Sequence, residues 1–152
     1  MGNARFFVGV KALIRNKKGR ILVLQANTAT FQLTKTPKPF YDLPGGRIQP
    51  SENVEEALGR EVKEELGISP KTLGINQLFD ASVSKVMLPN KVGVRLERVP
   101  LFLVTFLCDL TVNERFKLSD EHIGFAWVDA KRAKKLLAKK FNSAFLKKLN
   151  KL

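Results

Sequence analysis

The sequence predicts an α/β fold in which a mixed β-sheet is layered between helices, with an amphipathic helix at the C-terminus. Apolar stretches typical of strands occur both before and after one strongly signalled helix, and the end of the chain repeats apolar residues at helical spacing. The length of 152 residues and the hydrophobic content of 44% suit one core. We therefore expect a single domain over residues 1–152.

Two strands and a short turn are predicted to open the chain. Residues 6–15 (FFVGVKALIR) and 20–26 (RILVLQA) are largely apolar, and they flank a turn in which Gly19 can adopt a positive φ. We expect a hairpin. Residues Asn27 to Pro39 show no periodicity and include Pro37, so we expect a loop that is a candidate substrate contact.

The helix beginning near Asn53 has the clearest boundaries. Asn53 can cap its start together with Glu56, and Gly67 can end it in the left-handed conformation. At helical spacing, Glu61 and Glu65 project at the margin of the apolar stripe, whereas the acids of an ordinary solvated helix lie opposite it. The stripe consists of Val54, Leu58, Val62 and Leu66.

Further strands and a terminal helix are predicted after this central helix. Residues Leu73 to Phe79, Val99 to Leu110 and Ile123 to Val128 read as strands. We expect a basic loop near or between the first two, containing Lys85, Lys91, Arg95 and Arg98. Residues Ala130 to Leu152 carry apolar residues every four positions, which predicts one amphipathic helix, or two helices broken at Asn142-Ser143.

Charge is abundant and unevenly distributed. The chain has 27 Lys and Arg against 14 Asp and Glu, a net charge of +13. The acids concentrate between Glu52 and Glu65, while residues 131–152 contain basic residues and no acids. Basic surfaces attract polyanions such as nucleotides, phosphorylated metabolites and RNA. The tail is therefore either a packed helix with solvated lysines or a patch for RNA or an anionic membrane.

The lone cysteine and the hydropathy pattern bear on location. Cys108 lies in an apolar run, so we expect a buried thiol without an internal disulfide, which fits a reducing compartment. The apolar stretch near the N-terminus is too short to span a bilayer. We expect no transmembrane segment and a cytoplasmic location.

Three glutamates of the central helix predict a metal site. Glu61, Glu64 and Glu65 stand at i, i+3 and i+4, which brings them together on one side of a helix. Converging carboxylates repel one another unless a cation joins them, and Mg²⁺ prefers oxygen ligands and pairs with phosphates. Gly45 and Gly46 let the backbone approach closely. The chemistry suggested is metal-assisted attack on a phosphate chain.

The run from Gly46 to Ile68 resembles the Nudix box, G-x5-E-x7-R-E-U-x-E-E-x-G-U, in which U is a bulky aliphatic residue. Every defined position matches, and the preceding YDLPG resembles the lead-in common in this hydrolase family. The order of elements along the chain is also similar to the Nudix fold, an α/β/α sandwich. The matching residues are Gly46, Glu52, Arg60, Glu61, Val62, Glu64, Glu65, Gly67 and Ile68.

This resemblance implies roles for the residues of the box. Glu61, Glu64 and Glu65 would be catalytic and bind Mg²⁺, with Mn²⁺ as a substitute, helped by the carbonyl of Gly45. Arg60 would orient its neighbours and pair with Glu52. The remaining support of the box would come from Glu52, Gly46 and Gly67.

A further acid is expected outside the box. The segment LSDEHIGFAWVD resembles the Nudix region in which a loop glutamate before a Trp-containing strand binds metal or acts as general base. Glu121 is the candidate and Asp120 its rival. The alternative is that Ser119-Asp120 simply form a turn. His122 is assigned no catalytic role, because no second His or Cys stands near it in sequence.

The function implied is a Mg²⁺-dependent pyrophosphohydrolase that splits a nucleoside diphosphate linked to another group. The second signatures of several Nudix subfamilies are absent, so the substrate stays open. Arg47, Phe40 and Tyr41 are candidate substrate contacts, and Phe31 joins the aromatic residues that could stack on a base, although each aromatic also fits ordinary packing. The alternatives are an RNA 5′-end pyrophosphohydrolase and a non-catalytic nucleic-acid-binding module. RNA and a homodimer remain open as partners.

Overall fold

A seven-stranded sheet forms the centre of the protein. The computed structural model describes residues 2–31, 39–111 and 115–152. The strands run in the order β3-β2-β1-β6-β5, with β4 paired to β1 and β7 paired to β2. Strands β1 and β6 are parallel while the other pairs are antiparallel, so the predicted mixed sheet is confirmed. The strands are β1 (Phe7–Arg15), β2 (Ile21–Ala26), β3 (Tyr41–Asp42), β4 (Gly45–Arg47), β5 (Leu73–Val92), β6 (Arg95–Leu110) and β7 (His122–Val128).

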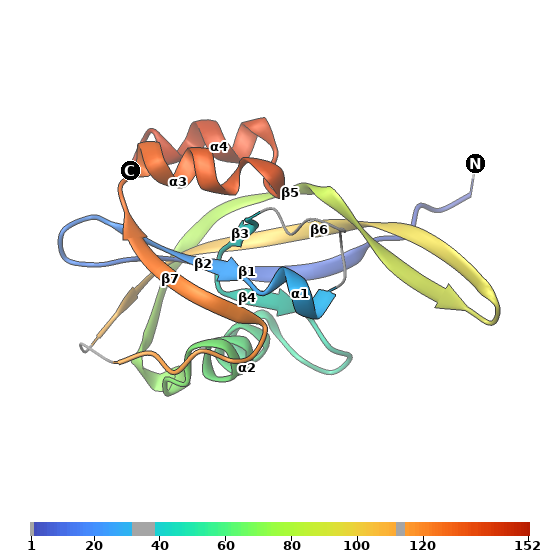
Figure 1. Ribbon diagram of the computed structural model, residues 1–152, viewed down its shortest axis with the longest axis horizontal. Helices are drawn as coiled ribbons and strands as arrows, with labels where there is room; N and C mark the ends of the chain where they lie inside the picture. The colour runs from blue at the N-terminus through green and yellow to red at the C-terminus, as the bar shows by residue number, and fades with distance from the viewer. Residues whose placement is uncertain (1, 32–38, 112–114) are drawn as a thin grey trace.

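Helices cover both faces of this sheet. Helix α2 (Val54–Leu66) lies against one face, and α3 (Ala130–Leu136) and α4 (Ser143–Leu149) lie against the other (Figure 1). Three short elements complete the described chain: α1 (Thr28–Phe31) and the 3₁₀ turns η1 (Pro70–Thr72) and η2 (Leu137–Lys139). The expected sandwich of helix, sheet and helix is confirmed.

Alternation along the strands produces a core on each face. In β1, Val10, Ala12 and Ile14 pack with the apolar stripe of α2. Leu13, of opposite parity, packs with the apolar side chains of α3 and α4 on the other face. Both faces are covered, so β1 reads as a nearly continuous apolar run that only Lys11 interrupts.

The ends of α2 agree with the sequence prediction. The side chain of Asn53 accepts a hydrogen bond from the Glu56 N–H at 2.8 Å, which caps the first turn. At the other end Gly67 adopts φ 68°, and its N–H donates to the Lys63 carbonyl at 3.0 Å. The hairpin between β1 and β2 is likewise confirmed, with Gly19 at φ 74°.

The region between β5 and β6 differs from the prediction. Instead of a basic loop, β5 continues to Val92, turns at Gly93 (φ 62°) and returns as β6 from Arg95. Figure 1 shows this long hairpin extending beyond the rest of the sheet. Its outer part is a two-stranded ribbon without a buried face, and its apolar residues Val92, Val94 and Leu96 are exposed. The four basic residues predicted there are exposed along it: Lys85, Lys91, Arg95 and Arg98.

Several smaller predictions can be compared with the structure. The expected loop from Asn27 to Pro39 is wrong at its start, where Thr28–Phe31 form α1, and residues 32–38, with Pro37, lie outside the described part. The break at Asn142 is confirmed, because its side chain accepts from the Phe145 N–H at 2.9 Å and caps α4. Cys108 is a buried free thiol. None of the helices in the described residues is long and apolar enough to cross a membrane.

Candidate active site

The box residues line one wall of a cleft of about 690 Å³. Helix α2 supplies Arg60, Glu61, Glu64 and Glu65, and β4 supplies Gly45 and Gly46. Glu121 and His122 border the cleft at the start of β7. The structure thus brings acids from two distant segments to one cavity, as the sequence predicted for the box and the later glutamate.

Arg60 holds three carboxylates. Its Nη2 donates to Glu52 Oε2 at 3.0 Å, and its Nη1 donates to Glu61 Oε1 at 2.9 Å and to Glu64 Oε2 at 3.4 Å. The hydrogen bonds from Arg60 lower the pKa of Glu52, whose carboxylate also accepts from the Gln49 N–H at 2.9 Å. The guanidinium therefore ties the loop before α2 to the acids on the helix and offsets their mutual repulsion.

Glu61 lies over the backbone of Gly46. A Cβ built on Gly46 would stand 2.4 Å from Glu61 Oε1, so a larger residue there would push this carboxylate from its place. Burial raises the pKa of Glu61, although Arg60 opposes that shift. Glu64, one turn from Arg60, has an exposed side chain at the mouth of the cleft.

Glu65 is the most buried acid of the box, with 5% of its surface exposed. Its Oε2 accepts from the Gly45 N–H at 2.8 Å. Burial raises the pKa of Glu65 to about 8, against the opposing effects of the Lys11 ammonium and of this hydrogen bond. A carboxyl with such a pKa gains strongly from a cation beside it.

Gly45 adopts φ 135°, and a Cβ there would lie 2.0 Å from the Val10 carbonyl. Its own carbonyl, which the family resemblance assigns to the metal, accepts a hydrogen bond from Lys11 Nζ at 2.8 Å. A carbonyl oxygen has two lone pairs, so Lys11 leaves one for a second partner. No pattern in the sequence indicates this contact.

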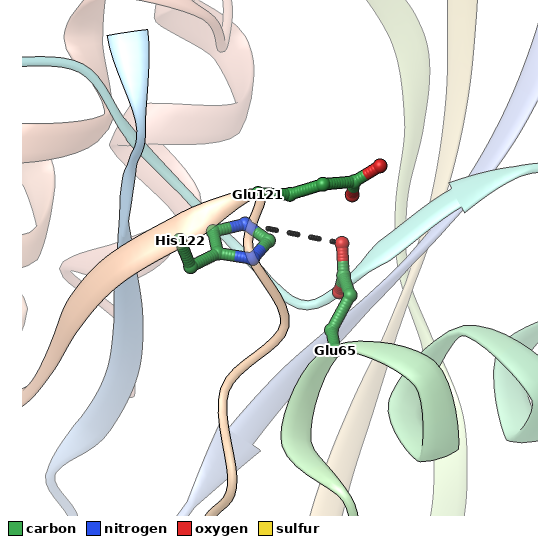
Figure 2. Close-up of side chains that lie close together, drawn as sticks. All are labelled: Glu65, Glu121 and His122. Atoms are coloured by element: carbon green, nitrogen blue, oxygen red, sulfur yellow. Dashed lines mark ion pairs between the residues drawn. The ribbon is translucent and has the colours of Figure 1, made fainter. Parts of the chain in front are cut away.

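Glu65, Glu121 and His122 form a compact group (Figure 2). One ligand atom of each lies within 4.8 Å of the others, and His122 Nε2 lies 3.9 Å from Glu65 Oε1. Backbone contacts hold the two segments together, since the Ser119 N–H donates to the Glu65 carbonyl and the Asn27 N–H to the Glu121 carbonyl. The fold thus places Glu65 next to Glu121 and His122, which are far from it in the sequence.

His122 departs from the sequence interpretation. It was expected to be an ordinary loop residue, yet its side chain is 7% exposed and faces the acids. Burial lowers the pKa of His122, so the imidazole is neutral at pH 7. Its Nδ1 is buried and has no hydrogen-bond partner among the described residues. Sequence reasoning missed it because a lone histidine carries no spacing signal.

Of Asp120 and the candidate substrate contacts, only some border the cleft. Asp120 is exposed and is not among the residues that line the cleft; its carbonyl accepts from Asn27 Nδ2 at 3.0 Å. Phe40 and Arg47 border the cleft, whereas Tyr41 packs against the core under α3 and α4. The side chain of Phe31 lies outside the described part of the chain.

A second charged group lines the same cleft. Lys11, from β1, donates to Asp42 Oδ2 at 2.9 Å, and Lys140, between η2 and α4, pairs with the same oxygen. Both lysines and Asp42 border the cleft. The one signal in the sequence was Lys11 interrupting an otherwise apolar strand.

The donor set fits a divalent cation. Glu65 and Glu121 offer carboxylate oxygens, hard ligands of the kind that Mg²⁺ and Mn²⁺ prefer, within 4.8 Å of each other and of a His122 ring nitrogen. Glu61 and Glu64 line the same cleft but do not belong to this group. The raised pKa values of Glu61 and Glu65 report carboxyls whose negative charge is poorly compensated by the protein.

Comparisons with known proteins agree with this geometry. The family model described as the NUDIX domain matches residues 5–149. The nucleoside triphosphatase NudI of Escherichia coli O17:K52:H18 is 32% identical over 87 residues, which are 57% of this chain and 59% of NudI. The chain thus spans less than two thirds of the length of the curated relatives it matches.

Solved structures share the fold over nearly the whole chain. A MutT protein from Methanosarcina mazei Go1 superposes with a TM-score of 0.62 and 25% identity, covering 99% of this chain and 95% of that one. A C. elegans Ap4A hydrolase gives a TM-score of 0.64 at 22% identity, covering 95% and 96% of the two chains. The E. coli dihydroneopterin triphosphate pyrophosphohydrolase gives 0.63 at 20% identity, covering 97% and 96%.

Proposed function

Because the chain belongs to the Nudix family, we propose that it is a hydrolase of phosphoanhydride bonds that depends on a divalent cation, Mg²⁺ or Mn²⁺. Its substrate is a nucleoside diphosphate linked to another group, and water attacks one of the phosphates. The observation that best supports this function is that Glu65 and Glu121 meet in the cleft, close to the carboxylates that hydrogen-bond to Arg60.

The box residues have separate roles in this proposal. Glu61, Glu64 and Glu65 hold the cation, with the free lone pair of the Gly45 carbonyl as a further donor. The bound cation would neutralise phosphate oxygens and lower the pKa of the attacking water. Arg60 fixes Glu61 and Glu64 through its hydrogen bonds, and Glu52 fixes Arg60 from the other side. Gly46 leaves room for Glu61.

Glu121 is the proposed general base. It is exposed at the border of the cleft, so its carboxylate keeps contact with water while lying near Glu65. A carboxylate in this position accepts the proton of the attacking water as the bond to phosphorus forms. The buried neutral imidazole of His122 lies beside the two acids, with Nε2 3.9 Å from Glu65 Oε1 (Figure 2).

The chemical class of the substrate follows from the relatives and the cleft. The related NudI carries the description nucleoside triphosphatase, which supports a nucleotide for this chain. Phe40 at the cleft border offers an aromatic face for a base, and Arg47 lies near it, stacked at 4.8 Å on the Phe7 ring. The buried lone thiol of Cys108 supports a cytoplasmic location.

The 5′ end of RNA is a second candidate substrate. The observation that favours it is the basic hairpin of β5 and β6, where Lys85, Lys91, Arg95 and Arg98 are exposed. Such a surface attracts a polyanion independently of its sequence, and the affinity would fall steeply with salt. Free nucleotides and RNA ends share the same reacting group, so both are compatible with the box.

A substrate panel read by product mass tests the proposal. The purified protein is incubated with Mg²⁺ and, separately, with Mn²⁺, on nucleoside triphosphates, dinucleotides, ADP-ribose and triphosphorylated RNA. The expected result is a phosphorylated product from at least one substrate and none without metal. Absence of product from every substrate under both metals would refute the hydrolase assignment, and RNA binding without cleavage would favour a binding module.

A further inference from the structure

Three buried charges lie on the sheet side of the cleft, away from the Arg60 network. Lys11 is 3% exposed and Asp42 is 8% exposed, and the side chain of Lys140 is 13% exposed. Asp42 Oδ2 accepts from both ammonium groups, while its Oδ1 accepts from the Leu43 N–H at 2.7 Å. One carboxylate thus serves two ammonium groups.

The two lysines differ in how far their donors are used. Lys11 Nζ makes three hydrogen bonds, to Asp42, to the Leu43 carbonyl at 3.2 Å and to the Gly45 carbonyl at 2.8 Å. An ammonium has three donors, so Lys11 is saturated. Lys140 Nζ bonds only Asp42 among the described residues, which leaves two donors of a nearly buried cation without an acceptor.

The charge balance indicates what is lacking. Lys11 and Lys140 share the one carboxylate of Asp42, and Lys11 has two carbonyl acceptors besides it. Lys140 is therefore left undercompensated, and burial lowers its pKa even though Asp42 opposes that shift. Buried charges are retained when a partner satisfies them, and here a cleft opens beside the undercompensated one.

The surroundings fix where a ligand would lie. Lys140 belongs to the corner between η2 and α4, and its carbonyl accepts from the Ser84 hydroxyl at 2.6 Å and from the Lys85 N–H at 2.9 Å. These contacts anchor the backbone on the strand β5. A contact series then runs from Lys140 through Asp42, Lys11 and Gly45 to Glu65, so the subsite and the carboxylates share one cleft.

We propose that Lys140, held by Asp42 and Lys11, forms an anion subsite that takes a phosphate group of the substrate beyond the diphosphate at the carboxylates. The inference rests on the proposed function, because it assumes that a phosphate chain enters this cleft. It makes the protein selective for substrates with a third phosphate, such as a nucleoside triphosphate, over those with two. Lys140 is then a specificity-determining residue.

Binding of non-hydrolysable analogues tests the subsite without requiring turnover. Calorimetry with Mg²⁺ compares an ATP analogue with methylene bridges at both the α,β and β,γ positions and α,β-methylene-ADP on the wild type, on Lys140→Gln and on the control Lys147→Gln, an exposed lysine of α4. Lys140→Gln is expected to weaken the triphosphate analogue at least about tenfold, as for a lost hydrogen bond to a charged group, and the diphosphate analogue less than about twofold. The control should match the wild type.

Two results would overturn the subsite: equal weakening of both analogues, which identifies Lys140 as a tether of the helix corner, or no weakening of either. If Lys140→Gln does not fold, the wild type supplies a second readout. The Nζ resonance of Lys140 in ¹⁵N-lysine-labelled protein should shift when inorganic triphosphate is added, and an unmoved resonance at saturation contradicts the proposal. Calorimetry and the Lys140 resonance both report binding without hydrolysis. They therefore test the subsite even if the substrate panel shows that the protein is not a hydrolase.

Discussion

The carboxylate of Glu61 rests directly on the backbone of Gly46, where a Cβ would come within 2.4 Å of Oε1 and 2.5 Å of Cδ. The contact joins strand β4 to helix α2 without a hydrogen bond. It explains why a glycine opens the box: the first residue of the pattern is the floor on which one of its proposed metal ligands lies.

Gly46→Ala should displace the Glu61 side chain and lower kcat/KM about 100-fold, because a shift of about 1 Å at a catalytic group costs this much. Steady-state kinetics on the substrate found in the panel measure the loss. The control is Gly124→Ala in β7, where the nearest atom to an added Cβ is 3.9 Å away. Near-wild-type activity of Gly46→Ala would contradict the role given to Glu61.

Glu65→Gln should lower kcat by at least about 100-fold, since it removes a charged ligand and leaves an amide oxygen to accept from the Gly45 N–H. The melting temperature should stay the same or rise, because a carboxyl that burial disfavours is replaced by a neutral group. Glu55→Gln, on the exposed side of α2, is the control and should leave both quantities unchanged. An active Glu65→Gln enzyme would exclude Glu65 as a ligand.

The pKa of Glu65, about 8, predicts that cation binding competes with a proton. In the metal-free protein the folded-state pKa is raised above the unfolded value of 4.5, so this group's stabilising contribution is present below pH 4.5 and is lost as the pH rises through 8. Stabilisation by Mg²⁺ should run the opposite way and grow between pH 6 and pH 8, by up to about 1.4 kcal/mol per pH unit.

Thermal unfolding with and without Mg²⁺ across that pH range measures the linkage. Glu65→Gln supplies the comparison, because the variant lacks the titrating group and should show a flatter dependence. A wild-type Mg²⁺ effect that does not change between pH 6 and pH 8 would show that the cation does not displace a proton from Glu65.

Glu121→Gln should lower kcat by about 100-fold to 10,000-fold, the range of a general base, with a smaller change in KM. Asp120→Asn, one residue earlier and outside the cleft, should stay within about twofold of the wild type. Rate against pH for both variants separates a base from a residue that only supports the turn. If Asp120→Asn suffers the larger loss, the assignment of the two acids must be exchanged.

The two ends of α2 agree with the sequence prediction, because its signals are local. Asn53 and Gly67 act through backbone groups a few positions away, and the box spacing follows from the helical repeat. The β5/β6 hairpin was missed because its outer ribbon has no buried face, so the few apolar residues around Gly93 do not mark a core strand.

The grouping of Lys11, Asp42 and Lys140 in the cleft could not be predicted from the sequence. Lys11, Asp42 and Lys140 come from a strand, a two-residue strand and a helix corner, and only tertiary packing brings them together. His122 was given no catalytic role for the same reason: it lies beside Glu65, which is far from it in sequence, and beside the adjacent Glu121. Local spacing encodes helices and their faces, whereas these sites depend on strand register.

The parallel pairing of β1 with β6 sets an order for biosynthesis. Phe7 lies opposite Leu101 and Arg15 opposite Asp109, so β1 has no partner on that edge until residues 101–109 have been made. Pairings of such sequence separation close slowly. During synthesis β1 can pair with β2 and β4 while its other edge stays open, and the cleft cannot be complete before Lys140 has been added.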